Sequence, residues 1–270
     1  MLVVTLGDLL LDVIVRLGEP LAAGADANAE TKTAAGGQAA NVAAWVVALG
    51  GGARCVARRG DDPAGTVLAA ELGVRGVELV GPAGGRNGVV VSLVAPDGER
   101  TMASDRGASP LLEPDDLDPA WFACDCLHIS GYALLAKPID GAALRAVELA
   151  RAHGARVSVD LSAWTRIREY GPTRFRERLE SLAPDVVFAN EPEWEILGGA
   201  YALAPAAVIK RGARGLLVLG KERVELPARG GPVVDATGAG DALAAGFLLG
   251  GPELALEAAA RCVAQLGAMP

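Results

Sequence analysis

A glycine-rich turn near the carboxyl end of the chain carries an acid where a helix is expected to begin. Asp235-Ala236-Thr237-Gly238-Ala239-Gly240-Asp241 precedes an apolar run at residues 242–249. The glycines let the backbone present N–H groups at a helix start, where anions bind. A carboxylate at Asp241 would repel such an anion, but it could take a proton from a neighbouring hydroxyl. The stretch therefore indicates phosphoryl transfer to a hydroxyl, with a plain turn and an acidic helix start as the alternative.

A second glycine pair, Gly36-Gly37, opens an apolar helix predicted to end near residue 50. Paired glycines let a ligand approach the backbone closely. Asn41 lies on the first turns of this helix and could both donate to and accept from a sugar hydroxyl, although an exposed amide is the ordinary alternative. Asp12 comes soon after a buried strand at residues 2–6 and is expected at the mouth of a crevice.

The rest of the chain alternates between short apolar runs and amphipathic segments, which predicts βαβ units and a parallel sheet. A β-hairpin interrupts this alternation at 88–102, around a turn at 96–98. Together with a half-exposed strand at 12–17, the hairpin could form a flap that excludes water. The expected strands lie at 54–58, 77–80, 126–129, 156–160, 185–189, 208–210 and 216–219, and the expected helices at 63–72, 115–122, 139–153, 173–182 and 253–266.

Polar residues follow several of these strands, at the edge where parallel sheets bind ligands. Asn190 and Glu193 begin a helix and point the same way, which suits water-mediated binding of Mg²⁺, with a capping box as the alternative. We interpret His128 as a buried core residue and Asp160 as a strand-end carboxylate. Arg106 is interpreted as part of a solvated loop.

Charge and cysteine content exclude several classes of protein. The 33 acidic and 25 basic residues give a net charge of −8, which argues against nucleic acid or an anionic membrane as a partner. The four cysteines form no CxxC pair and there are only two histidines, so a zinc site is not expected. We find no signal-peptide pattern and no run of eighteen apolar residues, and we expect a cytoplasmic protein.

In their order along the chain, these motifs resemble the ribokinase-like, or PfkB, family of carbohydrate kinases. The resemblance covers essentially the whole chain. One match would be weak, but seven in the family's order are strong. They are Gly7 with Asp12; Gly36-Gly37 with Asn41; Gly60-Asp61-Asp62 with Gly65; residues 98–102; Asn190 with Glu193; Lys210-Arg211-Gly212 with Gly215; and Asp235 to Asp241.

The resemblance implies an α/β fold, a three-layer α/β/α sandwich with a mostly parallel central sheet and a small β lid. Residues 1–270 would form one kinase domain, with lid strands within about 12–34 and 87–103, and the lid could join two copies in a homodimer. ATP would phosphorylate a hydroxyl. In this reading Asp241 is the base and Gly238, Ala239 and Gly240 form the anion hole. Asp12, Gly36, Gly37 and Asn41 would hold the acceptor; Asn190, Lys210, Gly212 and Gly215 the nucleotide; Asn190 and Glu193 a water-bound Mg²⁺; and Asp235 a monovalent cation such as K⁺.

Departures from the family pattern concern the acceptor. Leu10 stands where ribose-specific members carry asparagine, and Gln38 where they carry a basic residue. Trp45 is the one aromatic residue between Val13 and Met102, which favours a sugar over a nucleoside. The alternatives are a nucleoside kinase, an acceptor with an acidic group bound by Arg100 or Arg106, and a sugar-binding regulatory protein without turnover. A dinucleotide-dependent oxidoreductase is disfavoured because no GxGxxG follows the first strand.

Overall fold

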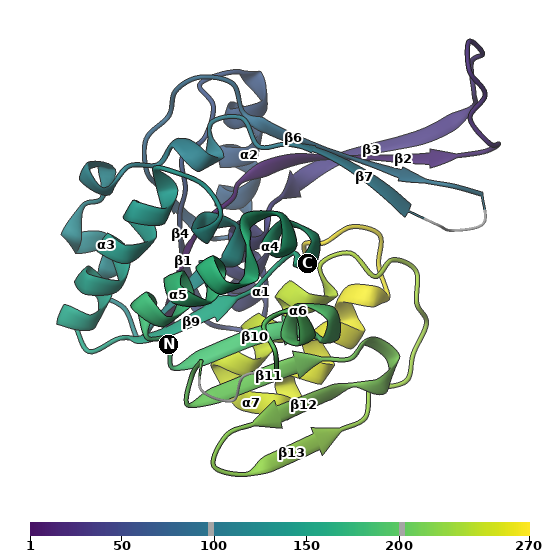
Figure 1. Cartoon of the computed structure of the whole chain (residues 1–270). Coiled ribbons are helices and arrows are strands. Elements are labelled where there is room, and N and C mark those ends of the chain that lie inside the picture. The colour runs from purple at the N-terminus through teal and green to yellow at the C-terminus, as the bar shows by residue number, and fades with distance from the viewer. Residues whose placement is uncertain (97–99, 200–202) are drawn as a thin grey trace.

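A nine-stranded sheet forms the centre of the computed structural model, which describes residues 1–96, 100–199 and 203–270 (Figure 1). The strand order is β13 (Arg223–Leu226), β12 (Leu216–Leu219), β11 (Ala206–Lys210), β10 (Val186–Asn190), β9 (Arg156–Asp160), β8 (Cys126–Ser130), β1 (Leu2–Leu6), β4 (Gly52–Val56) and β5 (Glu78–Val80). Neighbouring strands from β11 to β5 pair in parallel, while β12 and β13 are added antiparallel at one edge.

Helices cover both faces of this sheet and enclose two separate cores. Alternate residues of a strand face opposite sides, so Val4 and Leu6 pack into one core and Val3 into the other. The first core packs against α3 (Ile139–Ala152), α4 (Trp164–Tyr170), α5 (Pro172–Leu182) and α6 (Glu191–Ile196). The second packs against α1 (Gln38–Ala48), α2 (Pro63–Val74) and α7 (Ala239–Val263). The predicted three-layer α/β/α sandwich is confirmed.

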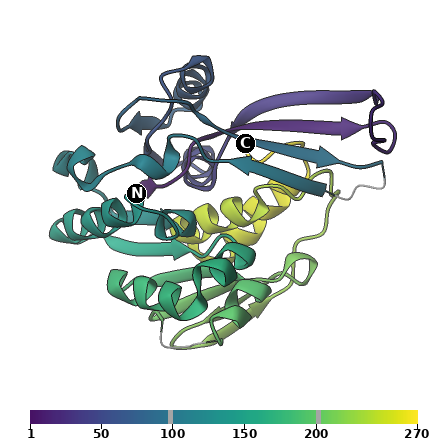
Figure 2. The same ribbon diagram turned by 45° about the horizontal axis from the view of Figure 1, so that its top comes forward.

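A second, four-stranded sheet projects from the sandwich (Figures 1 and 2). Its order is β3 (Ala29–Gly36), β2 (Leu10–Leu17), β6 (Gly88–Val94) and β7 (Arg100–Asp105). Strand β2 pairs antiparallel with β3, placing Leu10 opposite Gly36, and parallel with β6, placing Leu10 opposite Gly88. The predicted turn at 96–98 falls partly on residues 97–99, outside the described part of the chain.

A buried asparagine joins this small sheet to the sandwich. Asn87 is 1% exposed and precedes β6. Its Oδ1 accepts from the Gly60 amide at 3.0 Å, and its backbone N–H donates to Asp62, whose other carboxylate oxygen caps α2 at Gly65. The Gly60-Asp61-Asp62 motif therefore has a structural role, because it fixes where β6 leaves the sandwich.

We expect Asn87→Ala to lower the free energy of unfolding by about 1–3 kcal/mol, because the Gly60 amide would lose its side-chain acceptor inside the protein. Urea denaturation measures this change. Asn28→Ala, at an exposed position, is the matched control and should change stability by less than about 0.5 kcal/mol. Equal losses in the two variants would contradict the anchoring role.

Three helix predictions need correction. Residues 115–122 form two 3-10 helices, η2 (Pro114–Asp116) and η3 (Pro119–Phe122), in place of one helix. Pro114 and Pro119 each begin a new short helix, because proline lacks the N–H that a continuous helix would need there. Helix α4 is missing from the predictions, since it is only one or two turns long. The predicted helices at 242–249 and 253–266 are the two halves of α7, separated by the non-helical Gly251, and only the predicted end is wrong, because the second half ends at Val263. The other 3-10 helices are η1 (Ser109–Leu111), η4 (Gly131–Leu134) and η5 (Gly212–Arg214).

Helix α7 is long and apolar enough to cross a membrane by length and composition. Its break at Gly251, with Pro252 directly after it, interrupts the helix, and half of its most apolar window is buried within the protein. Ala242, Leu243 and Leu248 belong to the second core. The apolar character of α7 is thus explained by packing in the sandwich.

Candidate active site

Polar groups from distant parts of the chain meet at the carboxyl edge of the central sheet. Asp8 follows β1, Asp160 ends β9, Asn190 ends β10 and Lys210 ends β11. The amino-terminal ends of α1 and α7 reach the same region, as the bond between their first turns shows. Ligands of open parallel sheets bind at this edge, so the topology itself places a candidate site here.

A hydrogen bond between Asn41 and Asp241 joins the two signature motifs, which are Gly36-Gly37 with Asn41 and the loop from Asp235 to Asp241. Asn41 Nδ2 donates to Asp241 Oδ2 at 2.7 Å. Asn41 is 6% exposed, and its Oδ1 has no hydrogen-bond partner among the described residues. A buried acceptor without a donor is costly, and a ligand hydroxyl is one group that could supply the missing donor.

The glycine pair brings Asp8 and Asp12 close to the start of α1. A Cβ on Gly36 would lie 2.2–2.5 Å from the carboxyl atoms of Asp12, so only glycine leaves room for that carboxylate. Gly37 has φ of 96°, and a Cβ there would lie 2.6 Å from the Asp8 carbonyl oxygen. Repulsion from Asp12 contributes to the raised pKa of Asp241, which places both acids in one electrostatic environment.

The first turn of α7 offers a backbone donor beside Asp241. Gly238 adopts a left-handed conformation as the N-cap, and the amides of Asp241 and Ala242 donate to its carbonyl oxygen at 3.0 and 2.9 Å. The Ala239 amide makes a long 3.4 Å bond to Ala236. Within the described ranges, the Gly240 amide has no backbone acceptor outside α7. This amide, at a helix start, is therefore suited to an anion.

Asp241 is poised to exchange a proton near neutral pH. Packed protein atoms desolvate the carboxyl group and, with repulsion from Asp160 and Asp12, raise its pKa from 3.8 to about 7. The Asn41 hydrogen bond and the positive charge of Lys210 act in the opposite direction. A carboxyl group with a pKa near the working pH can act as a general base.

This shift also predicts how stability depends on pH. The folded state binds the Asp241 proton more tightly than the unfolded chain, so ionisation of Asp241 destabilises the fold increasingly from about pH 4 to about pH 7. We expect Asp241→Asn to be more stable than the parent at pH 8 by on the order of 1 kcal/mol, with little difference at pH 4.5. Urea unfolding at both pH values tests this. A difference that does not change with pH would contradict it.

Asn190 and Glu193 form a reciprocal capping box. Glu193 accepts from the Asn190 backbone and side-chain amides at 2.8 and 2.9 Å, and Asn190 Oδ1 accepts from the Glu193 amide at 2.9 Å. Each of these oxygens keeps a lone pair for a water molecule. In the described parts of the chain, no group of three or more His, Cys, Asp or Glu side chains could hold a metal directly. The donor set thus fits Mg²⁺ bound through water.

Asp235 closes the loop before α7. One carboxylate oxygen accepts from the Thr237 amide at 2.9 Å and from its hydroxyl at 2.5 Å, and the other accepts from the Gly267 amide at 3.1 Å. The carboxylate therefore connects the signature loop to the carboxyl-terminal segment. This connection gives Asp235 a structural role whether or not a cation binds the loop.

Lys210 lies beside the start of α7, and two glycines of the predicted nucleotide motif follow it in the chain. Lys210 Nζ donates to both carboxylate oxygens of Asp160, at 2.8 and 2.7 Å. A Cβ on Gly212 would meet nothing within 4 Å, so this backbone is open to a ligand. A Cβ on Gly215 would lie 2.0 Å from the Leu226 carbonyl oxygen, which explains that glycine by strand packing alone.

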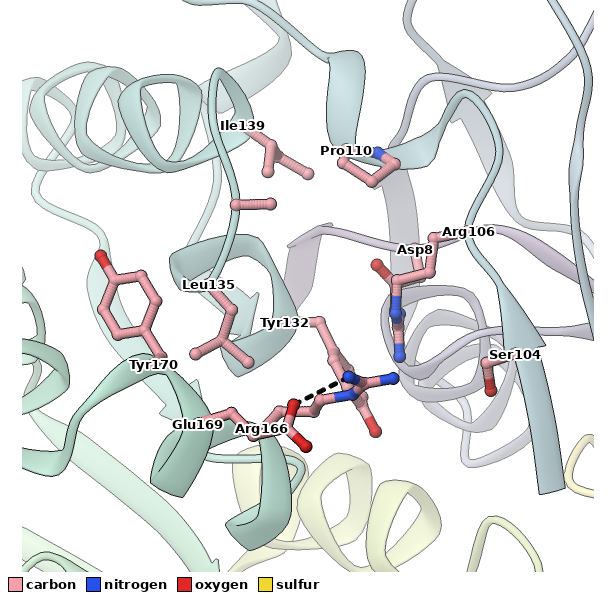
Figure 3. Close-up of a pocket in the computed structure, with 11 residues that line it drawn as sticks. Asp8, Ser104, Arg106, Pro110, Tyr132, Leu135, Ile139, Arg166, Glu169 and Tyr170 are labelled. Atoms are coloured by element: carbon pink, nitrogen blue, oxygen red, sulfur yellow. Dashed lines mark hydrogen bonds and ion pairs between the residues drawn. The ribbon is translucent and has the colours of Figure 1, made fainter. Parts of the chain in front are cut away.

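A cavity of about 350 Å³ lies on the far side of Asp8 (Figure 3). Arg106 pairs with Asp8, and its guanidinium lies 3.4 Å from the centre of the Tyr132 ring. Arg166, which also lines the cavity, pairs with Glu169 at 2.8 Å. Asp241, Asp12 and Asn41 do not line this cavity, but Asp8 joins it to the Gly37 backbone.

The interpretation of Arg106 as a solvated loop residue is wrong. Its side chain is only 25% exposed, because Asp8 and Tyr132 hold it against the protein. Asp8 and Tyr132 both follow predicted strands, and that position was the only sequence signal for them. The side chain of Arg100 lies outside what the structure describes. His128 is fully buried against Phe188, as expected, and its pKa falls to about 4 through desolvation.

Comparison with known proteins identifies the family. The family model for pfkB family carbohydrate kinases matches residues 1–269. The chain belongs to this family. It is therefore a phosphotransferase of the sugar-kinase class, and the resemblance drawn from the seven motifs is confirmed.

Relatives of this pfkB-family kinase differ in their named substrates. Fructokinase-1 of Zea mays is 35% identical, with 92% of this chain and 82% of that protein covered. The ATP-dependent ribose-1-phosphate kinase of Halopiger xanaduensis is 31% identical, with 93% and 86% covered. The solved structure of adenosine kinase from Sinorhizobium meliloti has a TM-score of 0.89 at 28% identity, with 99% and 95% covered.

Proposed function

We propose that this pfkB-family kinase transfers the γ-phosphoryl group of ATP to a hydroxyl of a small neutral sugar, with Asp241 as general base. The observation that carries the proposal is the contact between Asn41 and Asp241. Asn41 leaves one buried oxygen without a donor beside a carboxyl group whose pKa is about 7. A sugar with adjacent hydroxyls could donate to both.

In this proposal the acceptor hydroxyl lies between Asp241 and the Gly240 amide. Asp241 removes the hydroxyl proton as the oxygen attacks phosphorus, while the bond to the ADP leaving oxygen breaks. The Gly238, Ala239 and Gly240 backbone stabilises the charge on the transferred group. Asp12, Gly36, Gly37 and Asn41 hold the acceptor, and Lys210, Gly212, Gly215 and Asn190 lie toward the nucleotide.

The metal assignments belong to the same proposal. Asn190 and Glu193 would hold Mg²⁺ through water, and the ion would neutralise charge on the phosphates. A monovalent cation such as K⁺ would bind at the Asp235 loop. Its test is turnover in potassium chloride against tetramethylammonium chloride at equal ionic strength. Equal rates would exclude a role for K⁺.

The cavity next to the proposed acceptor residues, which Asp8 joins to Gly37, supports a neutral sugar over other acceptors. Its two arginines are each paired with a carboxylate, so an acidic group would have to displace Asp8 or Glu169. The Arg106 guanidinium covers the Tyr132 ring, so a nucleobase stacking there would have to displace it. Trp45 is 1% exposed and donates to the Ala268 carbonyl oxygen, so it cannot form the wall of a base site.

ADP release across a panel of acceptors tests the proposal. The panel holds hexoses, pentoses, sugar acids, sugar phosphates and nucleosides, each with Mg-ATP. We expect the highest kcat/KM with a neutral sugar. A preference for nucleosides or sugar phosphates would overturn the acceptor class. Sugar binding without turnover would favour the regulatory alternative and overturn the kinase mechanism proposed for this site.

The same proposal extends to the oligomeric state, the location and the partners of the protein. We propose a homodimer formed through the four-stranded sheet and a cytoplasmic protein without nucleic-acid or membrane partners. The net charge of −8 supports the last point. Light scattering of the full chain, compared with a variant carrying additional lysines on β3, tests the dimer. A monomer in the parent protein would contradict it.

A further inference from the structure

An ion pair outside the two signature motifs lies beside the proposed base. Asp160 is fully buried, and the Lys210 side chain is 15% exposed. Two hydrogen bonds fix the ammonium on the carboxylate, and they link the ends of β9 and β11 across β10. A pair desolvated to this degree contributes little net stability, so stability alone does not explain why it lies beside Asp241.

Lys210 also contacts the start of α7. A Cβ on Gly240 would lie 3.2 Å from Lys210 Nζ and 3.4 Å from its Cδ, so the lysine side chain packs against the Gly240 backbone. Gly240 directly precedes Asp241 and carries the amide proposed to face the transferred group. The ion pair thus packs against the backbone of the proposed anion hole.

We propose that the Lys210–Asp160 ion pair is a positioning element of the active site, which holds the start of α7 and balances the charge that Asp241 experiences. This inference rests on the function proposed above. Lys210 acts here through Asp241 and Gly240 and need not touch the acceptor. Its role differs from a simple nucleotide contact, because it depends on Asp160.

Charge around Asp241 is predominantly negative, which is why one ammonium matters. Asp160 and Asp12 oppose ionisation of Asp241, whereas Lys210 and the Asn41 hydrogen bond favour it. Lys210 acts in the same sense on Glu193. The titratable groups that interact with Asp241 from the surrounding elements are Asp12 on β2, Tyr132 after β8, Asp160 on β9, Lys210 on β11 and Cys262 in α7.

The proposal predicts that two variants shift the pH profile of kcat/KM in opposite directions. We measure kcat/KM for the acceptor against pH, at saturating Mg-ATP, for Lys210→Met and Asp160→Asn. The acidic limb of the profile should move to higher pH by about one unit in Lys210→Met, so that kcat/KM below the limb falls about tenfold relative to the plateau of the same variant. In Asp160→Asn the acidic limb should move to lower pH by a similar amount.

Two controls separate charge from packing. Lys221→Met removes an exposed lysine in the β12–β13 turn and should leave the limb unchanged. Lys210→Arg keeps the charge and should return the limb to within about 0.3 units of the parent value. A merely structural role for Lys210 would lower the plateau and leave the limb in place.

Any result other than opposite displacements overturns the proposal. If Lys210→Met does not fold, Asp160→Asn alone decides, because only an ion pair that balances charge predicts a downward displacement. Asp241→Asn distinguishes this failure from failure of the proposed function. If Asp241→Asn loses turnover but the acidic limbs of Lys210→Met and Asp160→Asn do not move, only the ion-pair proposal fails. If Asp241→Asn keeps full turnover, the general-base assignment fails first.

Discussion

Replacing Asp241 with asparagine is expected to lower kcat by about 10²- to 10⁴-fold, the usual contribution of a positioned general base. Asparagine keeps the size of the side chain and can still pair with Asn41, so the fold and acceptor binding should change little. The physical reason for the loss is that an amide cannot accept the hydroxyl proton. Single-turnover phosphorylation with saturating Mg-ATP and acceptor measures the chemical step.

The same carboxyl group should set the acidic limb of the pH profile. Because Asp241 must be ionised to act as a base, kcat/KM should fall as the pH decreases through about 7. Asp26→Asn, at an exposed position in the loop between β2 and β3, is the matched control and should retain parent activity. Parent-like turnover in Asp241→Asn would remove the base from the proposed mechanism.

Replacing Asp12 with alanine is expected to raise the acceptor KM by about ten- to hundredfold. Hydrogen bonds to a charged group are each worth about 1.5–3 kcal/mol, and about 1.4 kcal/mol corresponds to a factor of ten. The carboxylate lies against Gly36 at the entrance to α1, on the acceptor side of the proposed site. The KM for ATP should therefore remain within about twofold of the parent value.

Initial-rate kinetics with each substrate varied in turn separates these effects. Asp12→Asn is the intermediate variant, since it keeps the shape and one acceptor oxygen, and its acceptor KM should fall between the parent and Asp12→Ala. Removal of a negative charge near Asp241 should also move the acidic limb slightly down. An increase in the KM for ATP alone would place Asp12 on the nucleotide side and contradict its assignment.

Local patterns in the sequence were sufficient to predict strands and helices that alternate around a parallel sheet, and the family resemblance added the three-layer sandwich. The strands predicted at residues 2–6 and 156–160 agree with β1 and β9 to the residue. Strand and helix periodicities are short-range properties, so they can be read without knowing which elements pack together. The two glycine motifs also marked helix starts, because the chain requires special backbone freedom there. Their order along the chain indicated the family.

Short and interrupted elements were harder to predict. Helix α4 is brief and lies between two well-patterned segments, and the second half of α7 ends at Val263, three residues before its predicted end. In both cases packing against neighbours, and not local propensity, determines the result. The two 3-10 helices at 114–122 similarly follow from proline positions within a compact loop.

Contacts between distant residues were determined only by the tertiary structure. The sequence by itself predicted which residues could do the chemistry: Asp241, Asn41 and the glycines that start their helices. It could not show that Asn41 meets Asp241 200 positions away, that Arg106 pairs with Asp8, or that Lys210 is fixed by Asp160. Those pairings depend on the order of the strands in the sheet, because strands that are neighbours in space bring their carboxyl ends together regardless of separation along the chain.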